Sequence, residues 1–77
     1  MAVKGLKQDR LYEFTRRYFY GGANIASLKK VYGFEYKKGK TDKDVKQIAM
    51  RACNAGYDTN TLLLTVAKEL DTVFNNA

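Results

Sequence analysis

The sequence predicts a mainly α-helical fold with four short helices, at about residues 6–20, 23–32, 42–55 and 59–74, and a short extended segment or β-ribbon at 34–40. Two observations support this fold class. Apolar residues recur at intervals of three and four, as on the buried face of a helix, and glycines interrupt that period where a helix would end. The 77 residues are 45% hydrophobic and contain no proline, so we expect one small folded domain without a linker.

The first two expected helices lie in the basic, aromatic half of the chain, residues 1–33. In the first helix, Leu11 and Phe14 share one ridge with Tyr18, and the charged side chains lie on the opposite side. A pair of glycines ends this helix. The second is shorter and turns three apolar residues inward, and a glycine follows it as a left-handed cap. Those inward residues are Ile25, Leu28 and Val31.

The segment at 34–40 reads FEYKKGK and departs from the helical period. Phe34 and Tyr36 alternate with polar residues as in a half-buried strand, but this alternation ends at Lys38. The segment is therefore either a short strand or a loop. In both cases its aromatic side chains would anchor it to the core and its lysines would be exposed.

The third expected helix, residues 42–55, has a clear start. Thr41 is a favourable N-cap, and Asp42 and Asp44 lie in the first turn, where a carboxylate complements the helix dipole. Five mostly small residues form the apolar stripe that follows. They are Val45, Ile48, Ala49, Ala52 and Cys53.

The fourth expected helix, residues 59–74, is the most apolar element of the chain, and Asp58 or Thr59 would cap it. A domain of this size buries a small core, and dimerisation is a common way to enlarge it. We therefore expect a homodimer held together by this helix. The predicted interface residues are Leu62, Leu63, Val66, Leu70 and Phe74.

The positive charge is concentrated in one half of the chain. Residues 1–40 contain ten Lys and Arg against three Asp and Glu, a net charge of +7, whereas residues 41–77 contain four against five, a net charge of −1. Such asymmetry indicates a surface that faces a polyanion. The candidate contact residues are Arg16, Arg17, Lys29, Lys30, Lys37, Lys38 and Lys40.

The composition argues against an enzyme. The chain has no histidine, so the usual general base and the commonest metal ligand are both missing. The single cysteine, Cys53, is expected to be a buried structural thiol, because free cysteine packs as a small hydrophobe. We therefore predict no catalytic residue, no metal and no cofactor. One cysteine and no long apolar run favour a cytoplasmic protein that does not enter a membrane.

Residues 34–77 resemble the ribbon-helix-helix family of Arc/MetJ-like DNA-binding modules. The resemblance rests on the order of an extended segment, a helix, a short glycine turn and an apolar helix, and on the spacing of Gly56, Asp58 and Asn60 before Leu62. In that family the strands of two chains pair as a ribbon in the major groove. The resemblance implies that Glu35 and Lys37, or Lys38 and Lys40, face the bases, and that backbone N–H groups at Thr59, Asn60 and Thr61 hold a phosphate.

These observations lead to two functional hypotheses. The first is a small, non-enzymatic protein that binds duplex DNA, as a dimeric transcriptional regulator or as an accessory factor of a mobile element. The alternative is a modulator or inhibitor that binds an acidic protein partner and has no DNA binding of its own. The two differ in whether the purified protein alone shifts duplex DNA.

Overall fold

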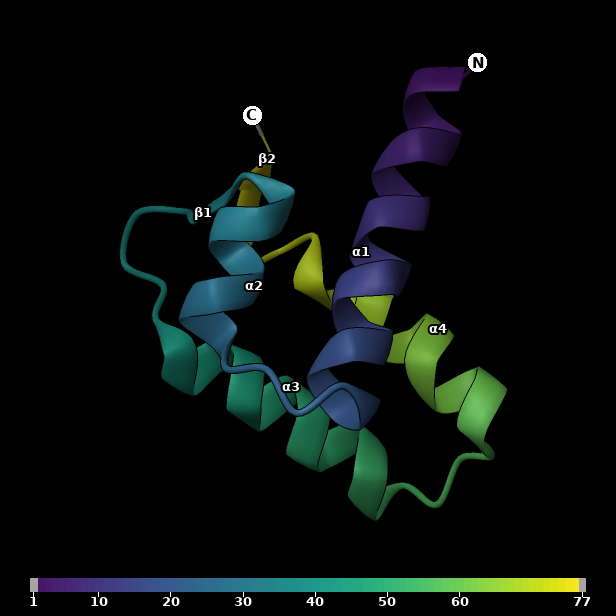
Figure 1. Cartoon of the computed structure of the whole chain (residues 1–77). Coiled ribbons are helices and arrows are strands. Elements are labelled where there is room, and N and C mark those ends of the chain that lie inside the picture. Colours follow the sequence, from purple (N-terminus) through teal and green to yellow (C-terminus); the bar gives the residue numbers. More distant parts are fainter. Residues whose placement is uncertain (1, 77) are drawn as a thin grey trace.

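The computed structural model describes the backbone of residues 2–76 and the side chains of residues 8–75. The mainly helical fold class is confirmed, with four helices and two short strands in the described part of the chain (Figure 1). The elements are α1 (Ala2–Tyr20), α2 (Ile25–Tyr32), β1 (Phe34–Tyr36), α3 (Asp42–Asn54), α4 (Thr59–Leu70) and β2 (Phe74–Asn76).

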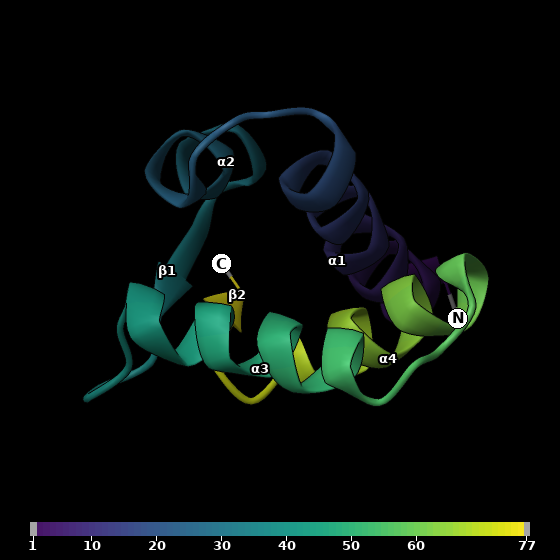
Figure 2. The ribbon, with the colours of Figure 1, turned by 90° about the horizontal axis from the view of Figure 1, so that it is seen from below.

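The helices surround one core. α1 packs along α4, and α3 packs against α4 and runs below the lower ends of α1 and α2 (Figure 1). Seen from below, the segment between β1 and α3 projects outward at one end of the molecule, and the turn between α3 and α4 lies at the other end (Figure 2). The long axis of α3 therefore separates these two connections.

Aromatic rings fill the centre of the core. The ring centroid of Phe14 lies 5.1 Å from that of Phe74 and 5.8 Å from that of Phe34, and those two rings stack on each other at 5.1 Å. Tilted and edge-on pairs at such distances add to the free energy gained by burial. This cluster joins α1 to both strands. The main cluster of buried apolar residues consists of Leu11, Phe14, Ile25, Leu28, Phe34, Val45, Ile48, Ala52, Val66, Ala67, Leu70, Val73 and Phe74.

The extended segment is a strand over part of its predicted length. β1 covers Phe34–Tyr36 and pairs antiparallel with β2, so that Phe34 lies opposite Asn76 and Tyr36 opposite Phe74. The backbone N–H of Lys37 still donates to the carbonyl of Val73 at 2.9 Å, and beyond it the chain turns. The strand therefore pairs with the C-terminus of its own chain.

The fourth helix is shorter than the sequence predicts. We expected it to run to about residue 74, but α4 ends at Leu70. The N–H groups of Thr72 and Val73 donate to carbonyls three residues earlier, both at 3.0 Å, and this tighter spacing ends the α-helical ladder. Phe74 then turns back into the core as part of β2.

Two apolar side chains predicted to be buried are exposed. Val31 has an exposed fraction of 69%, and Cys53 is also exposed. At about 100° per residue, Val31 lies about 120° around α2 from Ile25, and Cys53 lies about 40° past Ala49 on α3. In each helix, the arc of positions that are buried is therefore narrower than the arc that its apolar residues cover. Cys53 is not the buried structural thiol that the sequence predicts.

Candidate functional site

The segment between β1 and α3 forms a basic turn, which we define as residues 37–40. The N–H of Lys40 donates to the carbonyl of Lys37 at 3.0 Å, and Gly39 between them has a φ of 84°. Lys38 has no positive φ. This is the arrangement of a type II turn, which requires the third residue to adopt a positive φ that favours glycine. All four residues are exposed, so the turn presents three ammonium groups to solvent.

Tyr36 anchors the strand side of the basic turn. Its ring stacks on Phe74 with centroids 5.4 Å apart, and Phe74 is itself 1% exposed. The ammonium nitrogen of Lys29 lies 3.7 Å from the centre of the Tyr36 ring, within the range of a cation–π interaction. The Tyr36 hydroxyl donates to the carboxylate of Asp42. Burial raises the pKa of Tyr36 well above its ordinary value, and the hydrogen bond to Asp42 and the negative charge of that carboxylate add to the rise.

The helix side of the turn has the start predicted from sequence. The hydroxyl oxygen of Thr41 accepts from the N–H of Lys43 at 3.3 Å, and the carboxylate of Asp44 accepts from the N–H of Thr41 at 2.7 Å. This capping box satisfies backbone donors that the first turn of α3 would otherwise leave unpaired. Both ends of the basic turn are thus attached to ordered elements.

The basic turn belongs to a larger cationic surface, the basic end. Figure 1 shows the C-terminal part of α2, the turn and the first turns of α3 on the same side of the molecule. Between residues 29 and 46 there are seven lysines and three acids, a net charge of +4. Two of the acids, Asp42 and Asp44, accept the hydrogen bonds described above. The basic end consists of Lys29, Lys30, Lys37, Lys38, Lys40, Lys43 and Lys46.

Lys43 and Lys46 were not among the residues predicted from sequence. They are three residues apart, about one helical turn, and lie in the first two turns of a helix that starts beside the basic turn. Lys46 also lines a shallow pocket beside Asp42 and the start of α2. The N-cap at Thr41 fixes where the helix begins. Together with this spacing, it would have identified both lysines as neighbours of the basic turn.

Arg16 and Arg17, which were predicted to share the basic surface, lie in the last turns of α1. Both are exposed, and Arg16 is 3.8 Å from the carboxylate of Glu13. α1 ends where α2 begins, and Tyr18 near that end lines the same pocket as Lys46. Lys29 and Lys30 lie toward the other end of α2, a helix of 8 residues or about 12 Å. The described contacts do not join the two arginines to the basic turn.

Thr59 and Asn60, the predicted phosphate anchor, lie at the far end of the molecule. α3 separates them from the basic turn, and its 13 residues span about 20 Å. The carboxylate of Asp58 already accepts from the N–H of Thr61 at 3.3 Å, and the amide oxygen of Asn60 lies 3.5 Å from the hydroxyl of Tyr12. A carboxylate at this helix start opposes the binding of a phosphate.

The predicted dimer residues lie within a single chain. Leu63, Val66, Leu70 and Phe74 are between 1% and 3% exposed, and Leu62 is partly buried against the same core. α4 packs against α1 and α3, and Phe74 packs against Phe14 and Phe34, which leaves almost no surface of these four side chains for a second copy. The apolar arc that predicted an intermolecular interface therefore serves the core of the protomer.

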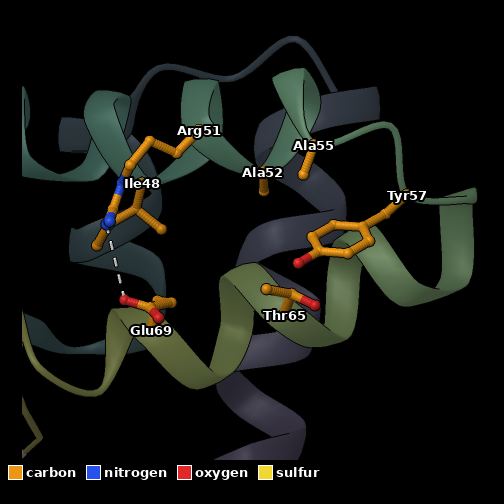
Figure 3. A pocket seen from close by; sticks show the side chains of 7 residues that line it. All are labelled: Ile48, Arg51, Ala52, Ala55, Tyr57, Thr65 and Glu69. Carbon is orange, nitrogen blue, oxygen red and sulfur yellow. Dashed lines mark ion pairs between the residues drawn. The ribbon is translucent and has the colours of Figure 1, made fainter.

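A shallow pocket opens between α3 and α4, with a volume of about 140 Å³ (Figure 3). Ile48 and Tyr57 contribute apolar surface, and an ion pair of 3.8 Å between Arg51 and Glu69 crosses one end. The side chains of Met50, Tyr57 and Leu64 on and near these helices are 63%, 46% and 49% exposed. Of these three residues, Tyr57 lines the pocket, whereas Met50 and Leu64 lie outside its lining.

No family model matches the chain, and no curated protein or solved structure is significantly similar to it. Within the described residues, no three histidine, cysteine or carboxylate side chains are grouped so that they could hold a metal ion. None of the helices in that part of the chain combines the length and the apolar character needed to cross a membrane.

Proposed function

We propose that this chain is a small, non-enzymatic DNA-binding protein that contacts the phosphates of duplex DNA through its basic end. The observation that carries the proposal is the basic turn, in which three exposed lysines project from a segment attached to the core at both ends. Lysine acts as a point charge toward phosphate, and each phosphate that it neutralises releases counterions from the duplex. Most of the affinity would come from this electrostatic term.

The neighbouring residues support contact with the backbone over contact with stacked bases. The aromatic ring closest to the basic turn, that of Tyr36, is covered by Phe74 and approached by the ammonium of Lys29. The ring therefore offers little free face on which an unstacked base could stack. Stacking of bases on aromatic rings is one of the contacts on which single-strand binding depends. A protein of this kind would act as a transcriptional regulator or as an accessory factor of a mobile element.

The proposal is tested by a matched pair of double variants. We expect Lys38→Ala/Lys40→Ala to weaken binding to a random-sequence duplex more than tenfold at 100 mM salt, because two phosphate contacts are lost. The control Arg51→Ala/Lys68→Ala removes the same charge from exposed positions on α3 and α4 away from the turn. Fluorescence anisotropy measures both affinities, and circular dichroism verifies that both variants fold. Equal weakening by the two pairs would show that net charge alone drives binding.

A second candidate function is favoured by the face between α3 and α4. Tyr57 lines the shallow pocket, and the exposed side chains of Met50 on α3 and Leu64 on α4 add apolar area that a modulator could use to bind a protein partner. The basic end would then steer an acidic partner into contact. In that case the purified protein alone would leave duplex DNA unshifted in a gel at 50 mM salt.

A further inference from the structure

The basic turn is closed at its base by a side-chain hydrogen bond. Tyr36 is the last residue of β1 and Asp42 is the first residue of α3, so the two flank the turn. The hydroxyl of Tyr36 donates to the carboxylate of Asp42 across the segment that holds the three lysines. The contact links side chains six residues apart and bridges the two elements that the turn connects.

Each partner of this hydrogen bond is held independently. Tyr36 is opposite Phe74 in the strand pair, and its ring stacks on the Phe74 ring. Asp42 begins a helix whose start is fixed by the capping box of Thr41 and Asp44. The hydrogen bond therefore joins two fixed points, and the turn between them is further restricted by its own bond from Lys40 to Lys37.

Such closure has a consequence for binding. A flexible loop loses conformational freedom when it binds, and that loss reduces the affinity, whereas a loop already held in one arrangement avoids most of it. Asp42 also has an effect of the opposite sign, because its negative charge lies two residues from Lys40 and weakens the attraction to phosphate. The hydrogen bond and the charge can be separated by mutation.

We propose that Tyr36 and Asp42 are positioning residues that hold the basic turn in the arrangement that receives the DNA phosphates. This inference rests on the proposed function and adds its mechanism. The ring of Tyr36 attaches the turn to the core, and its hydroxyl fixes the distance between the two ends of the turn. Neither side chain needs to contact DNA, so their effect on affinity acts through Lys37, Lys38 and Lys40.

The test compares variants of the full chain by anisotropy with a labelled random-sequence 20-base-pair duplex at 100 mM salt. Tyr36→Phe removes the donor and keeps the ring, and we expect it to raise the dissociation constant about threefold to tenfold. Asp42→Asn keeps an acceptor oxygen and removes the charge, and we expect it to bind at least as tightly as the wild type. Asp42→Ala removes the charge and the acceptor, so it is compared with Asp42→Asn, which removes the charge alone. We expect Asp42→Ala to bind more weakly than Asp42→Asn, and we expect this difference to disappear in the Tyr36→Phe background, where the hydrogen bond is already absent.

Tyr12→Phe is the matched control, because it removes a hydroxyl that faces Asn60 at the start of α4, far from the turn. A second readout does not depend on DNA: trypsin should cleave after Lys37, Lys38 or Lys40 faster in Tyr36→Phe than in the wild type or in Tyr12→Phe. If the wild type binds DNA and Tyr36→Phe has the same affinity and the same rate of trypsin cleavage as the wild type, this inference is wrong and the proposed function still stands. Absence of wild-type binding would overturn both.

Discussion

At the scale of single residues, Tyr36 combines the most contacts around the basic turn, and its ionisation provides a test of them. Its ordinary pKa is 10.0, and burial together with Asp42 raises the pKa in the folded protein above that value. The folded state therefore favours the protonated hydroxyl. The stabilisation is fully present below pH 10 and is lost as the pH rises from there toward the raised pKa, because the unfolded chain releases its proton first.

We accordingly predict that the free energy of unfolding of the wild type falls more steeply above pH 10 than that of Tyr36→Phe. Other tyrosines and the lysines ionise in both proteins, so the informative quantity is the difference between them. Urea unfolding followed by circular dichroism at several pH values from 8 to 11 measures it. A difference that stays constant across this range would mean that the Tyr36 hydroxyl is not held as described.

Residue-level predictions from the sequence succeed where an apolar position lies at the centre of a helical stripe. Leu11, Phe14 and Leu28 are buried as expected. Val31 and Cys53 lie at the edge of their stripes, where periodicity alone does not determine whether a neighbouring element covers the side chain. For α2 and α3 no such neighbour exists at these edges within the described part of the chain, and both side chains reach solvent.

At the scale of elements, the C-terminal strand is the part of the fold that the sequence does not predict. Val73 and Phe74 continue the apolar period of α4, so local pattern extends the helix through them. In the structure Phe74 instead belongs to a strand, which forms because it pairs with β1, about forty residues earlier in the chain. Such a non-local contact leaves no signal in the local sequence. By contrast, the N-cap at Thr41 is encoded within four residues and was predicted correctly.

The role of Phe74 in the protomer can be tested by Phe74→Ala, with Asn75→Ala as a control at the neighbouring exposed position. Removal of a fully buried phenyl ring costs about 3–5 kcal/mol, which is comparable with the entire stability of a domain of this size. We expect Phe74→Ala to be largely unfolded in thermal denaturation and Asn75→Ala to resemble the wild type. If Phe74 instead lay in a dimer interface, its replacement would mainly change how the unfolding midpoint depends on protein concentration.

At the scale of the whole molecule, the fold places the DNA-contact residues predicted from sequence in separate regions. α2, β1 and α3 bring seven lysines to the basic end, while Arg16 and Arg17 lie at the end of α1, and Thr59 and Asn60 lie beyond the far end of α3. The sequence identifies the local run at 37–40, because its composition is visible without a structure. It does not reveal which distant charges join that run, since this depends on how the helices pack.

If the basic end binds duplex DNA by neutralising phosphates, the binding constant depends steeply on the salt concentration. For four to seven phosphate contacts, the logarithm of the binding constant should fall with the logarithm of salt concentration with a slope between about −3.5 and −6. Replacement of Lys37, Lys38 and Lys40 by Ala should make that slope shallower by about 3. A wild-type binding constant that hardly changes between 50 and 200 mM salt, or a slope that is the same in the triple variant, would show that the basic turn does not bind phosphates.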